Sequence, residues 1–330
     1  MDLVDLRTFE TVARLGSMSR AASELHTVQS NVTARIRALE HELGTALFER
    51  HARGVLVTPA GRRVLPIAAR IAKLVAEACS AARDDGTPSG NLRLGSLETT
   101  AALRLSPLLT EFAATYPDVR LAVSSGTTAG LLRDVVDARL DGAFVAGPVA
   151  HRELAQEAVF EEELVLVSSP ALTSPAQLAD IAELRTVVFH YGCSYRQRLE
   201  NYLASIGVVS SRPLEFGSLD AILSCVAAGV GVTLLPRGVV AEAAARRRVA
   251  LHRIPKELAH VQTLFIRRKD AYLSSAMRAF VHMAGAFHAV GSAPGSGRSA
   301  RAGPARCVGR VSSAASESAR VGAPGSSSTT

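Results

Sequence analysis

The segment from Ser19 to Arg53 constrains the fold more than any other part of the chain, because it predicts two short helices joined by a tight turn and followed by a hairpin. Four apolar residues of the second helix recur at i, i+4, i+7 and i+11. At about 100° per residue they share one narrow stripe. These residues are Val32, Ile36, Leu39 and Leu43. The spacing predicts that this stripe is the core face of the helix and leaves the opposite face exposed.

Two earlier helices are predicted to complete a small helical core. The helix just before the turn is expected to have Ser19 as its N-cap and to bury Ala21, Ala22 and Leu25, where small side chains permit a close crossing. The first helix of the chain spans 3–15, and its periodic apolar residues complete the core. They are Leu6, Phe9, Val12 and Ala13.

The exposed face of the second helix carries small and polar side chains. Small residues let the helix backbone approach a DNA groove closely, and amide and hydroxyl groups around them can read base edges. The alternative is that such a face is only solvated, and the spacing alone leaves both interpretations open. The residues concerned are Gln29, Ser30, Asn31, Thr33, Ala34, Arg37 and His41.

A short hairpin is predicted after these helices. Arg50 and Arg53 precede Gly54 and the alternating Val55 and Val57, which places arginines near the hairpin tip. Arginines in that position suit contacts with phosphate or with the minor groove. Together, the helix pair and the hairpin predict a winged helix-turn-helix.

Charge is distributed unevenly along the chain. Residues 1–83 contain 12 Lys and Arg against 8 Asp and Glu, residues 84–290 contain 20 against 21, and residues 291–330 contain 5 against 1. The positive excess therefore lies on the predicted winged helix-turn-helix and on the C-terminal segment. This is the distribution expected if only the ends of the chain meet a polyanion.

A long helix follows the hairpin. It is expected to begin at Thr58 and Pro59 and to run to about Arg83, with Pro66 as a site for a kink. An ordinary helix covering the next domain is one interpretation. Dimerisation with a second copy is favoured, because alanine-rich seams suit close helix packing. The apolar side is formed by Val64, Ile67, Ile71, Leu74, Val75 and Ala78.

Beyond a linker at 84–90, strands alternate with helices, which predicts an α/β domain with a parallel sheet and two lobes joined by crossing strands. The predicted strands are 92–97, 119–124, 143–145, 164–168, 186–189, 214–216, 232–235 and 261–267. The predicted helices are 99–115, 127–140, 194–206, 219–228 and 271–289. The expected domains are 1–58, a linker helix at 59–83, and 91–289, with lobe 1 at about 91–162 and 267–289 and lobe 2 at about 163–266.

The last segment, 290–330, holds ten Ser, seven Gly, three Pro and five Arg, and is expected to be a disordered basic tail. We expect a cytoplasmic protein without a membrane segment, because no signal peptide opens the chain and no apolar stretch could span a bilayer. The four cysteines are far apart, so neither a disulfide framework, a metal site nor a cofactor is predicted. They are Cys79, Cys193, Cys225 and Cys307.

This order of parts resembles the LysR-type transcriptional regulators, over residues 1 to about 288. Met18, where the family often has Phe, and His41 depart from the pattern. The matching N-terminal residues are Phe9, Gly16, Ser17, Ala21, Ala22, Leu25, Gln29, Ser30, Leu39, Glu40, Leu43, Gly44, Leu47, Phe48, Arg50, Thr58 and Gly61. Gly90, Leu94, Gly95, Gly126, Asp141, Ala228, Gly229, Gly231, Leu235 and Pro236 match in the α/β domain.

The resemblance implies a regulator that binds double-stranded promoter DNA as a dimer within a homotetramer. It also implies a two-lobed, periplasmic-binding-protein-like effector domain that holds a small co-inducer, with RNA polymerase as a further partner. The implied recognition contacts come from Gln29, Ser30, Asn31, Thr33 and Arg35, with Arg35 placed for phosphate. The implied wing contacts come from Arg50 and Arg53.

Four helix starts that carry hydroxyl groups are expected to face the cleft between the lobes. Free amides and the helix dipole there favour an anion such as a carboxylate, although each hydroxyl could simply be an N-cap. Arg196 could pair with that anion or face solvent, and Cys193 is expected to line the cleft rather than act as a redox sensor. The predicted effector residues are Ser96, Thr99, Thr100, Thr127, Thr128, Cys193, Ser194, Tyr195, Arg196, Gly217 and Ser218.

Two alternatives remain open at this point. One is a DNA-binding regulator whose cleft is filled by side chains and senses nothing. The other is an α/β enzyme with accessory helices, which is disfavoured because the chain has no GxSxG, Walker loop, GxGxxG after a strand, or HExxH.

Overall fold

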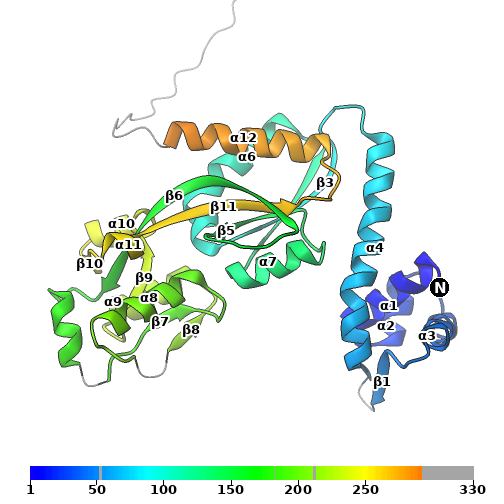
Figure 1. The fold of residues 1–330 in the computed structure, drawn as a ribbon, viewed down its shortest axis with the longest axis horizontal. Coiled ribbons are helices and arrows are strands. Elements are labelled where there is room, and N and C mark those ends of the chain that lie inside the picture. Colours follow the sequence, from blue (N-terminus) through cyan, green and yellow to red (C-terminus); the bar gives the residue numbers. More distant parts are fainter. Residues whose placement is uncertain (52–53, 182, 211–212, 292–330) are drawn as a thin grey trace, which may run out of the picture. The chain divides into compact units, whose positions relative to one another are not determined.

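The structure is a computed structural model that describes residues 1–51, 54–181, 183–210 and 213–291. Figure 1 shows the order of its elements along the chain. Arg53 and most of the predicted tail, from residue 292 onward, lie outside the described residues. Within the described part of the chain, no helix is long and apolar enough to cross a membrane.

The N-terminal domain is a three-helix unit followed by a two-stranded hairpin. Phe9 and Phe48 meet at its centre, with ring centroids 5.3 Å apart. Val32, Ile36 and Leu39 are fully buried, as their spacing predicts. The elements are α1 (Leu3–Leu15), α2 (Met18–Glu24), α3 (Gln29–Leu43), β1 (Phe48–His51) and β2 (Gly54–Val57).

Two local expectations in this domain are wrong. Ser17, rather than Ser19, is the N-cap of α2, because its side chain accepts a hydrogen bond from the Arg20 amide. Leu43 is 37% exposed and does not belong to the core face. It is the last residue of α3, where Gly44 in the left-handed conformation ends the helix beyond the reach of the other two helices.

The hairpin is held against the helices by a close backbone approach at Gly54. A Cβ atom there would lie 2.5 Å from the Gly16 carbonyl oxygen, and φ is +137°. The next amide, of Val55, donates to the same oxygen at 3.1 Å. Glycine is therefore the residue that lets the predicted wing dock on the turn between α1 and α2.

The long helix α4 (Pro59–Arg83) begins at Thr58, whose hydroxyl accepts a hydrogen bond from the Gly61 amide. Its buried contact with the winged domain includes Ala68. Ile67 and Leu74 are each 57% exposed, one seven-residue repeat apart on the same face. This apolar stripe has no partner among the described residues.

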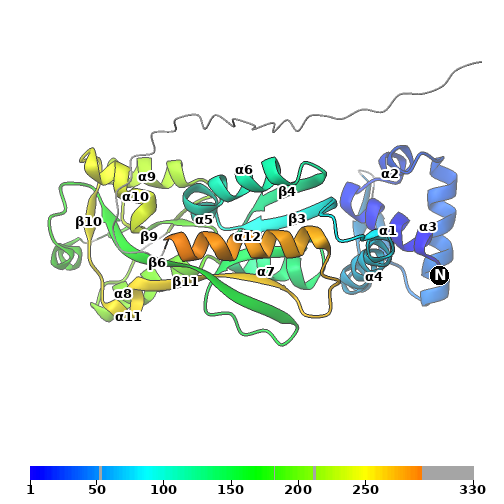
Figure 2. The ribbon, with the colours of Figure 1, turned by 90° about the horizontal axis from the view of Figure 1, so that it is seen from above.

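The first lobe of the α/β domain is a sheet covered on both faces. Strand β5 shows why, because Phe144 packs with α6 and α12 while its neighbours Ala143 and Val145 pack with α7. The views in Figures 1 and 2 agree with this layering. The elements are β3 (Gly90–Ser96), β4 (Val119–Ser125), β5 (Gly142–Ala146), α6 (Ser106–Thr115), α7 (Thr128–Val136) and α12 (Ser275–Gly291).

The predicted helix over 99–115 is present, but its first part differs from a regular α-helix. It consists of α5 (Glu98–Thr100) and a π-helical turn, η1 (Ala101–Leu105), that leads into α6. Such π-helical turns are frequent near functional sites. The predicted helix at 127–140 is shorter than expected, because α7 ends at Val136.

Two long antiparallel strands join the lobes, so the sheet is mixed rather than purely parallel. They are β6 (Leu154–Ser168) and β11 (His260–Arg268). The strands β3, β4 and β5 are parallel to each other, as predicted. The sequence prediction found only the end of β6, because the acidic run at 161–163 does not resemble a buried strand.

The second lobe packs around β6, partly on a core of its own and partly on a core that is continuous with the first lobe. Its elements β10, α10, α11 and η2 were not predicted from the sequence. They are β7 (Val187–Phe189), β8 (Leu214–Phe216), β9 (Thr233–Pro236), β10 (Ala250–His252), α8 (Ser194–Ser205), α9 (Leu219–Ala227), α10 (Arg237–Ala245), α11 (Lys256–Ala259) and η2 (Pro175–Asp180).

Candidate functional site

The exposed face of α3 is polar and lies opposite the buried stripe. Gln29, Ser30, Asn31 and Arg37 are exposed, and Thr33 is half-buried at the edge of this face. The predicted set thus lies together on one surface. A helix that presents short polar groups and an arginine opposite its core face has the form of a helix that enters a DNA groove.

Local hydrogen bonds restrain two side chains of this face. The Ser19 hydroxyl donates to Gln29 Oε1 at 2.8 Å, and Asn31 Nδ2 donates to Thr27 Oγ1 at 2.9 Å. These bonds connect the first turn of α3 to α2 and to the turn between the two helices. They hold amide groups in defined positions before any ligand arrives, which reduces the ordering cost of binding.

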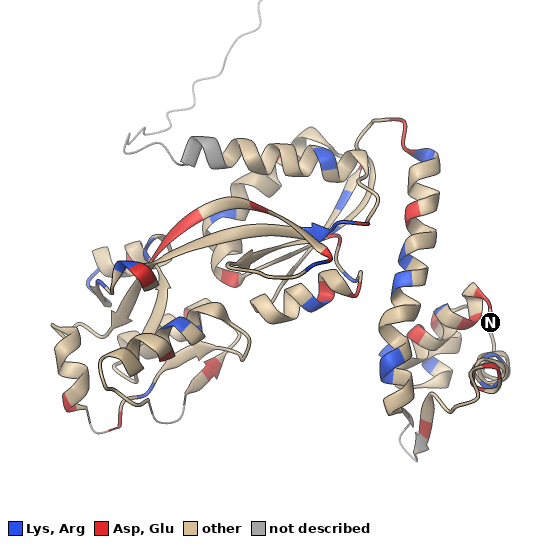
Figure 3. Ribbon diagram, in the orientation of Figure 1, with Lys and Arg blue, Asp and Glu red and all other residues tan. Residues whose placement is uncertain are grey.

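The arginines of the winged domain differ in the contacts that they make. Arg35 Nη1 donates to Asp5 Oδ1 at 2.9 Å, so this side chain also fixes α1 against α3. Arg37 forms no ion pair with the described residues and is free for an external anion. Arg50 belongs to β1, opposite Val55 in the hairpin register. Figure 3 shows further Lys and Arg residues along α4.

A small cavity of ≈ 150 Å³ lies between the two lobes. Lobe 1 contributes residues from the ends of β3 and β4 and the starts of α5 and α7, and lobe 2 contributes residues from the ends of β7 and β8 and the start of α8. Carboxyl ends of parallel strands are where ligands bind in open α/β sheets. The lining residues are Leu97, Glu98, Thr99, Ser125, Gly126, Thr127, Phe189, His190, Cys193, Tyr195 and Gly217.

The cavity contains some but not all of the predicted effector residues. Those that line it are Thr99, Thr127, Cys193, Tyr195 and Gly217. Thr128, Ser194 and Arg196 instead line a wider groove of ≈ 850 Å³ beside α7 and α8. Ser96, Thr100 and Ser218 line neither. Sequence reasoning missed six lining residues, although two of them, Phe189 and His190, lie at the end of a predicted strand and could have been identified. The missed residues are Leu97, Glu98, Ser125, Gly126, Phe189 and His190.

The start of α7 is occupied by atoms of the chain itself. The Thr127 hydroxyl accepts a hydrogen bond from the Gly130 amide, as an N-cap does. The Ala129 amide donates to the Gly192 carbonyl oxygen of the other lobe at 3.2 Å. These contacts connect the two lobes beside the cavity and satisfy donors that an anion would otherwise use.

The start of α8 places Cys193 and Arg196 in different environments. Burial raises the pKa of the Cys193 thiol, and the first-turn amides of Tyr195 and Arg196 only partly oppose this effect. A thiol with a raised pKa suits the lining role predicted for Cys193. The Arg196 guanidinium donates to Glu200 Oε1 at 2.9 Å and to Glu215 Oε1 at 2.6 Å, so its charge is already paired.

Two buried hydroxyl groups on the cavity wall have no hydrogen-bond partner in the described structure. They are Thr99 Oγ1, on α5, and Tyr195 Oη, on α8. Burial raises the pKa of Tyr195 to about 12, and the nearby Thr99 hydroxyl acts in the opposite direction. The two groups are therefore neighbours from opposite lobes, but their geometry does not make a proper hydrogen bond.

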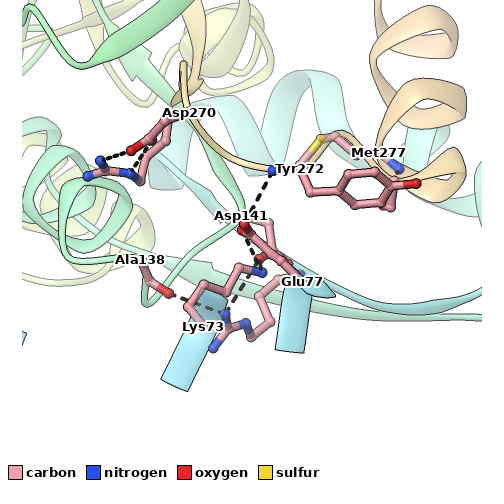
Figure 4. Close-up of polar contacts among 10 residues, drawn as sticks. Lys73, Glu77, Ala138, Asp141, Asp270, Tyr272 and Met277 are labelled. Carbon is pink, nitrogen blue, oxygen red and sulfur yellow. Dashed lines mark hydrogen bonds and ion pairs between the residues drawn. The ribbon is translucent and has the colours of Figure 1, made fainter. Parts of the chain in front are cut away.

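Polar contacts also join α4 to the α/β domain (Figure 4). Lys73 forms an ion pair with Asp141, which also accepts a hydrogen bond from the Arg93 amide at 2.7 Å. The Tyr272 amide donates to Glu77 Oε2 at 3.3 Å. The linker helix thus contacts the loop before β5 and the segment before α12.

Two family models match the chain and together cover almost all of its described part. Residues 3–62 match a bacterial regulatory helix-turn-helix protein of the lysR family, and residues 85–288 match the LysR substrate binding domain. These matches coincide with the winged domain and with the two-lobed domain described above.

Similar proteins with curated names are transcriptional regulators. The chain is 41% identical over 284 residues to the HTH-type transcriptional regulator GltR of Bacillus subtilis, which covers 86% of this chain and 96% of GltR. It is 44% identical over 276 residues to YofA of Bacillus velezensis, covering 84% of this chain and 95% of YofA.

The fold is also similar to solved structures. CbnR, a LysR family transcriptional regulator, matches with a TM-score of 0.62 and 24% identity, over 87% of this chain and 99% of CbnR. Because the family models and the curated relatives agree, the chain belongs to the LysR family of DNA-binding transcriptional regulators, which are not enzymes and which carry a substrate-binding domain.

Proposed function

We propose that this regulator reads promoter DNA with the exposed face of α3 and with its wing, and that a small effector bound between the lobes modulates this binding. The polar face of α3, opposite a fully buried stripe, carries the first part of the proposal. Gln29, Ser30, Asn31 and Thr33 are the proposed base-edge contacts. Arg37 and Arg50 are the proposed phosphate contacts, with Arg53 and Arg35 in support.

A substitution on α3 tests the groove contact. We expect Ser30→Leu to abolish specific operator binding while leaving the melting temperature within a few degrees of wild type, because Ser30 is exposed. Footprinting on the promoter beside the gene and thermal unfolding are the two measurements. Leu would obstruct the close approach of the helix to the groove without disturbing the core.

An arginine pair provides the matched control. Arg37→Ala should weaken binding to all DNA sequences, since one phosphate contact is lost. The slope of log affinity against log salt concentration should fall in magnitude by about one. Arg246→Ala removes an exposed arginine directly after α10, in lobe 2, and should change neither the affinity nor its salt dependence. If the footprint of Ser30→Leu on the operator were the same as that of the wild type, the assigned groove contact would be refuted.

The cavity between the lobes is the proposed effector site. Residues of both lobes line it, so an occupant would link them and could shift the balance between lobe arrangements. An anionic effector, as the sequence predicts, would depend on the first-turn amides of α8 and on hydroxyl groups. It would find no Lys or Arg among the described residues that line the cavity.

Self-association through α4 completes the proposal. A dimer that places two α3 helices on neighbouring DNA half-sites gains affinity that one copy lacks. The exposed stripe of Ile67 and Leu74 supports this interface. The family likeness includes CbnR, which has been solved in complex with its target DNA.

A further inference from the structure

The unpaired hydroxyls of Thr99 and Tyr195 point to a missing partner in the cavity. Thr99 is 2% exposed and Tyr195 is 3% exposed, yet neither hydroxyl has a hydrogen-bond partner in the part of the chain that the structure describes. A buried polar group without a partner destabilises the fold, so such groups in a native structure call for an explanation. Because the two hydroxyls are neighbours from different lobes, a single polar group of a ligand could form hydrogen bonds with both.

The charges around the cavity disfavour a negatively charged occupant. Glu98 and His190 are the ionisable residues that line it besides Cys193 and Tyr195, and the Glu98 carboxylate has no ionic partner among the described residues. The nearby cations are already engaged. Arg196 pairs with Glu200 and Glu215, Arg104 pairs with Glu162, and Arg198 donates to the backbone carbonyls of Gly147, Leu258 and His260.

The size and the wall of the cavity limit the rest of the ligand. Its volume of ≈ 150 Å³ is comparable to a protein cavity of about 150 Å³ that accommodates benzene. Leu97 and Phe189 supply apolar wall, and Gly126 and Gly217 leave room between the lobes. An apolar body of about one ring, with one polar group, fits this lining.

We propose that the effector is a ring-sized molecule without negative charge, whose hydrogen-bonding group bridges Thr99 Oγ1 and Tyr195 Oη across the two lobes. This rests on the proposed effector site and replaces the carboxylate that the sequence predicts. The hydroxyls either donate to a ligand oxygen or accept from a ligand amide, so an uncharged amide, alcohol or phenol satisfies them. The carboxylate of Glu98 further favours a ligand that brings a donor.

Two probes of the same size and shape test whether the cavity prefers a ligand without negative charge. Benzamide and benzoate share one ring and one planar head group and differ in charge. Calorimetry on the full chain should show benzamide binding about tenfold more tightly than benzoate, the ratio that ~1.4 kcal/mol gives. Glu98→Gln should narrow this ratio, because it removes the carboxylate that repels benzoate. Tighter binding of benzoate, or binding of neither probe, would overturn the proposal.

Substitutions of the two hydroxyl residues test the bridge. Tyr195→Phe and Thr99→Val each remove a hydroxyl that is unpaired in the free protein, so the melting temperature should stay unchanged or rise. Benzamide affinity should nevertheless fall about tenfold in each variant. Tyr202→Phe alters another buried tyrosine of α8 outside the cavity lining and should leave affinity unchanged. Unchanged affinity in Tyr195→Phe would show that the bridge does not form.

DNA binding by the same samples separates this inference from the proposed function. If benzoate alone alters operator affinity, the cleft is an effector site but the charge assignment is wrong. If benzamide binds in the cavity and operator affinity does not respond, the effector role is wrong. Gel-shift titration of wild-type protein with each probe provides this measurement.

Discussion

Asp84 shows how much a single side chain can connect. It follows the last residue of α4, and its side chain is only 5% exposed. Its carboxylate accepts hydrogen bonds from the Ser275 hydroxyl at 2.5 Å, the Tyr272 hydroxyl at 2.8 Å and the Ser275 amide at 2.9 Å. These bonds, with the Ser275 hydroxyl foremost, hold the pKa of Asp84 well below its usual value. The end of α4 is thereby tied to the start of α12.

A pH series on Asp84→Asn tests this contact. A carboxyl whose pKa is lowered on folding stabilises the protein at pH values above its ordinary pKa of 3.8. This contribution is lost as the pH falls below that value. We therefore expect the wild type to be more stable than the variant at neutral pH and the difference to shrink below about pH 4. Urea unfolding across this pH range measures the difference in the free energy of unfolding between the two proteins. Asp118→Asn, at an exposed site, should show no such trend, and a pH-independent difference at Asp84 would contradict the assignment.

The turn before α8 and the start of α7 meet across the lobes. Gly192 lies in the left-handed region with φ of +93°, and a Cβ atom there would lie 2.9 Å from Ala129 Cβ and 3.0 Å from Thr127 Oγ1. Its carbonyl also accepts the Ala129 amide. Two elements far apart in sequence are thus held together by a backbone contact that only glycine permits.

Gly192→Ala should destabilise the two-lobed domain by about 2–4 kcal/mol, combining left-handed strain with a steric clash. Gly207→Ala is the matched control, because Gly207 has φ of +73° and nothing within 4 Å of its missing Cβ. The control should cost only about 1–2 kcal/mol of strain. Chemical denaturation gives both values. If the two variants were equally destabilised, the contact between the lobes would contribute nothing.

For the molecule as a whole, the exposed stripe of α4 is the feature that the single chain leaves unexplained. Ile67, Leu74 and Val75 are large apolar side chains on an exposed helix surface, and burying such residues against a second copy is favourable. Charged residues on the same helix, such as Lys73, are instead committed to the α/β domain.

We expect Leu74→Glu to raise the dimer dissociation constant at least about tenfold, because it places a charge in an apolar interface. Operator affinity should fall with it. Sedimentation velocity reports the association state, and Ser80→Glu, on another face of α4, is the control that should remain associated. An unchanged association state in Leu74→Glu would exclude this stripe as the interface.

The local pattern of the sequence was enough to predict the elements that have a regular spacing of apolar residues or a clear first residue. The prediction at 194–206 differs from α8 by one residue, and the buried stripe of α3 was correct up to Leu39. These elements follow from spacing because one helix face is buried against a core. The first ten residues of β6 were missed, since their pairing partner, β11, lies about a hundred residues away.

The amino-acid order therefore specified a winged reading helix, a long linker helix and two α/β lobes, because helix and strand periods are local properties of the chain. It did not specify which polar residues meet. Thr99 and Tyr195 became neighbours, and Glu98 and His190 joined the same cavity, only because β6 and β11 bring the two lobes together. Ser96 and Ser218, equally plausible by local pattern, lie outside the cavity lining. Contacts between distant segments depend on packing and strand pairing, which no local period encodes.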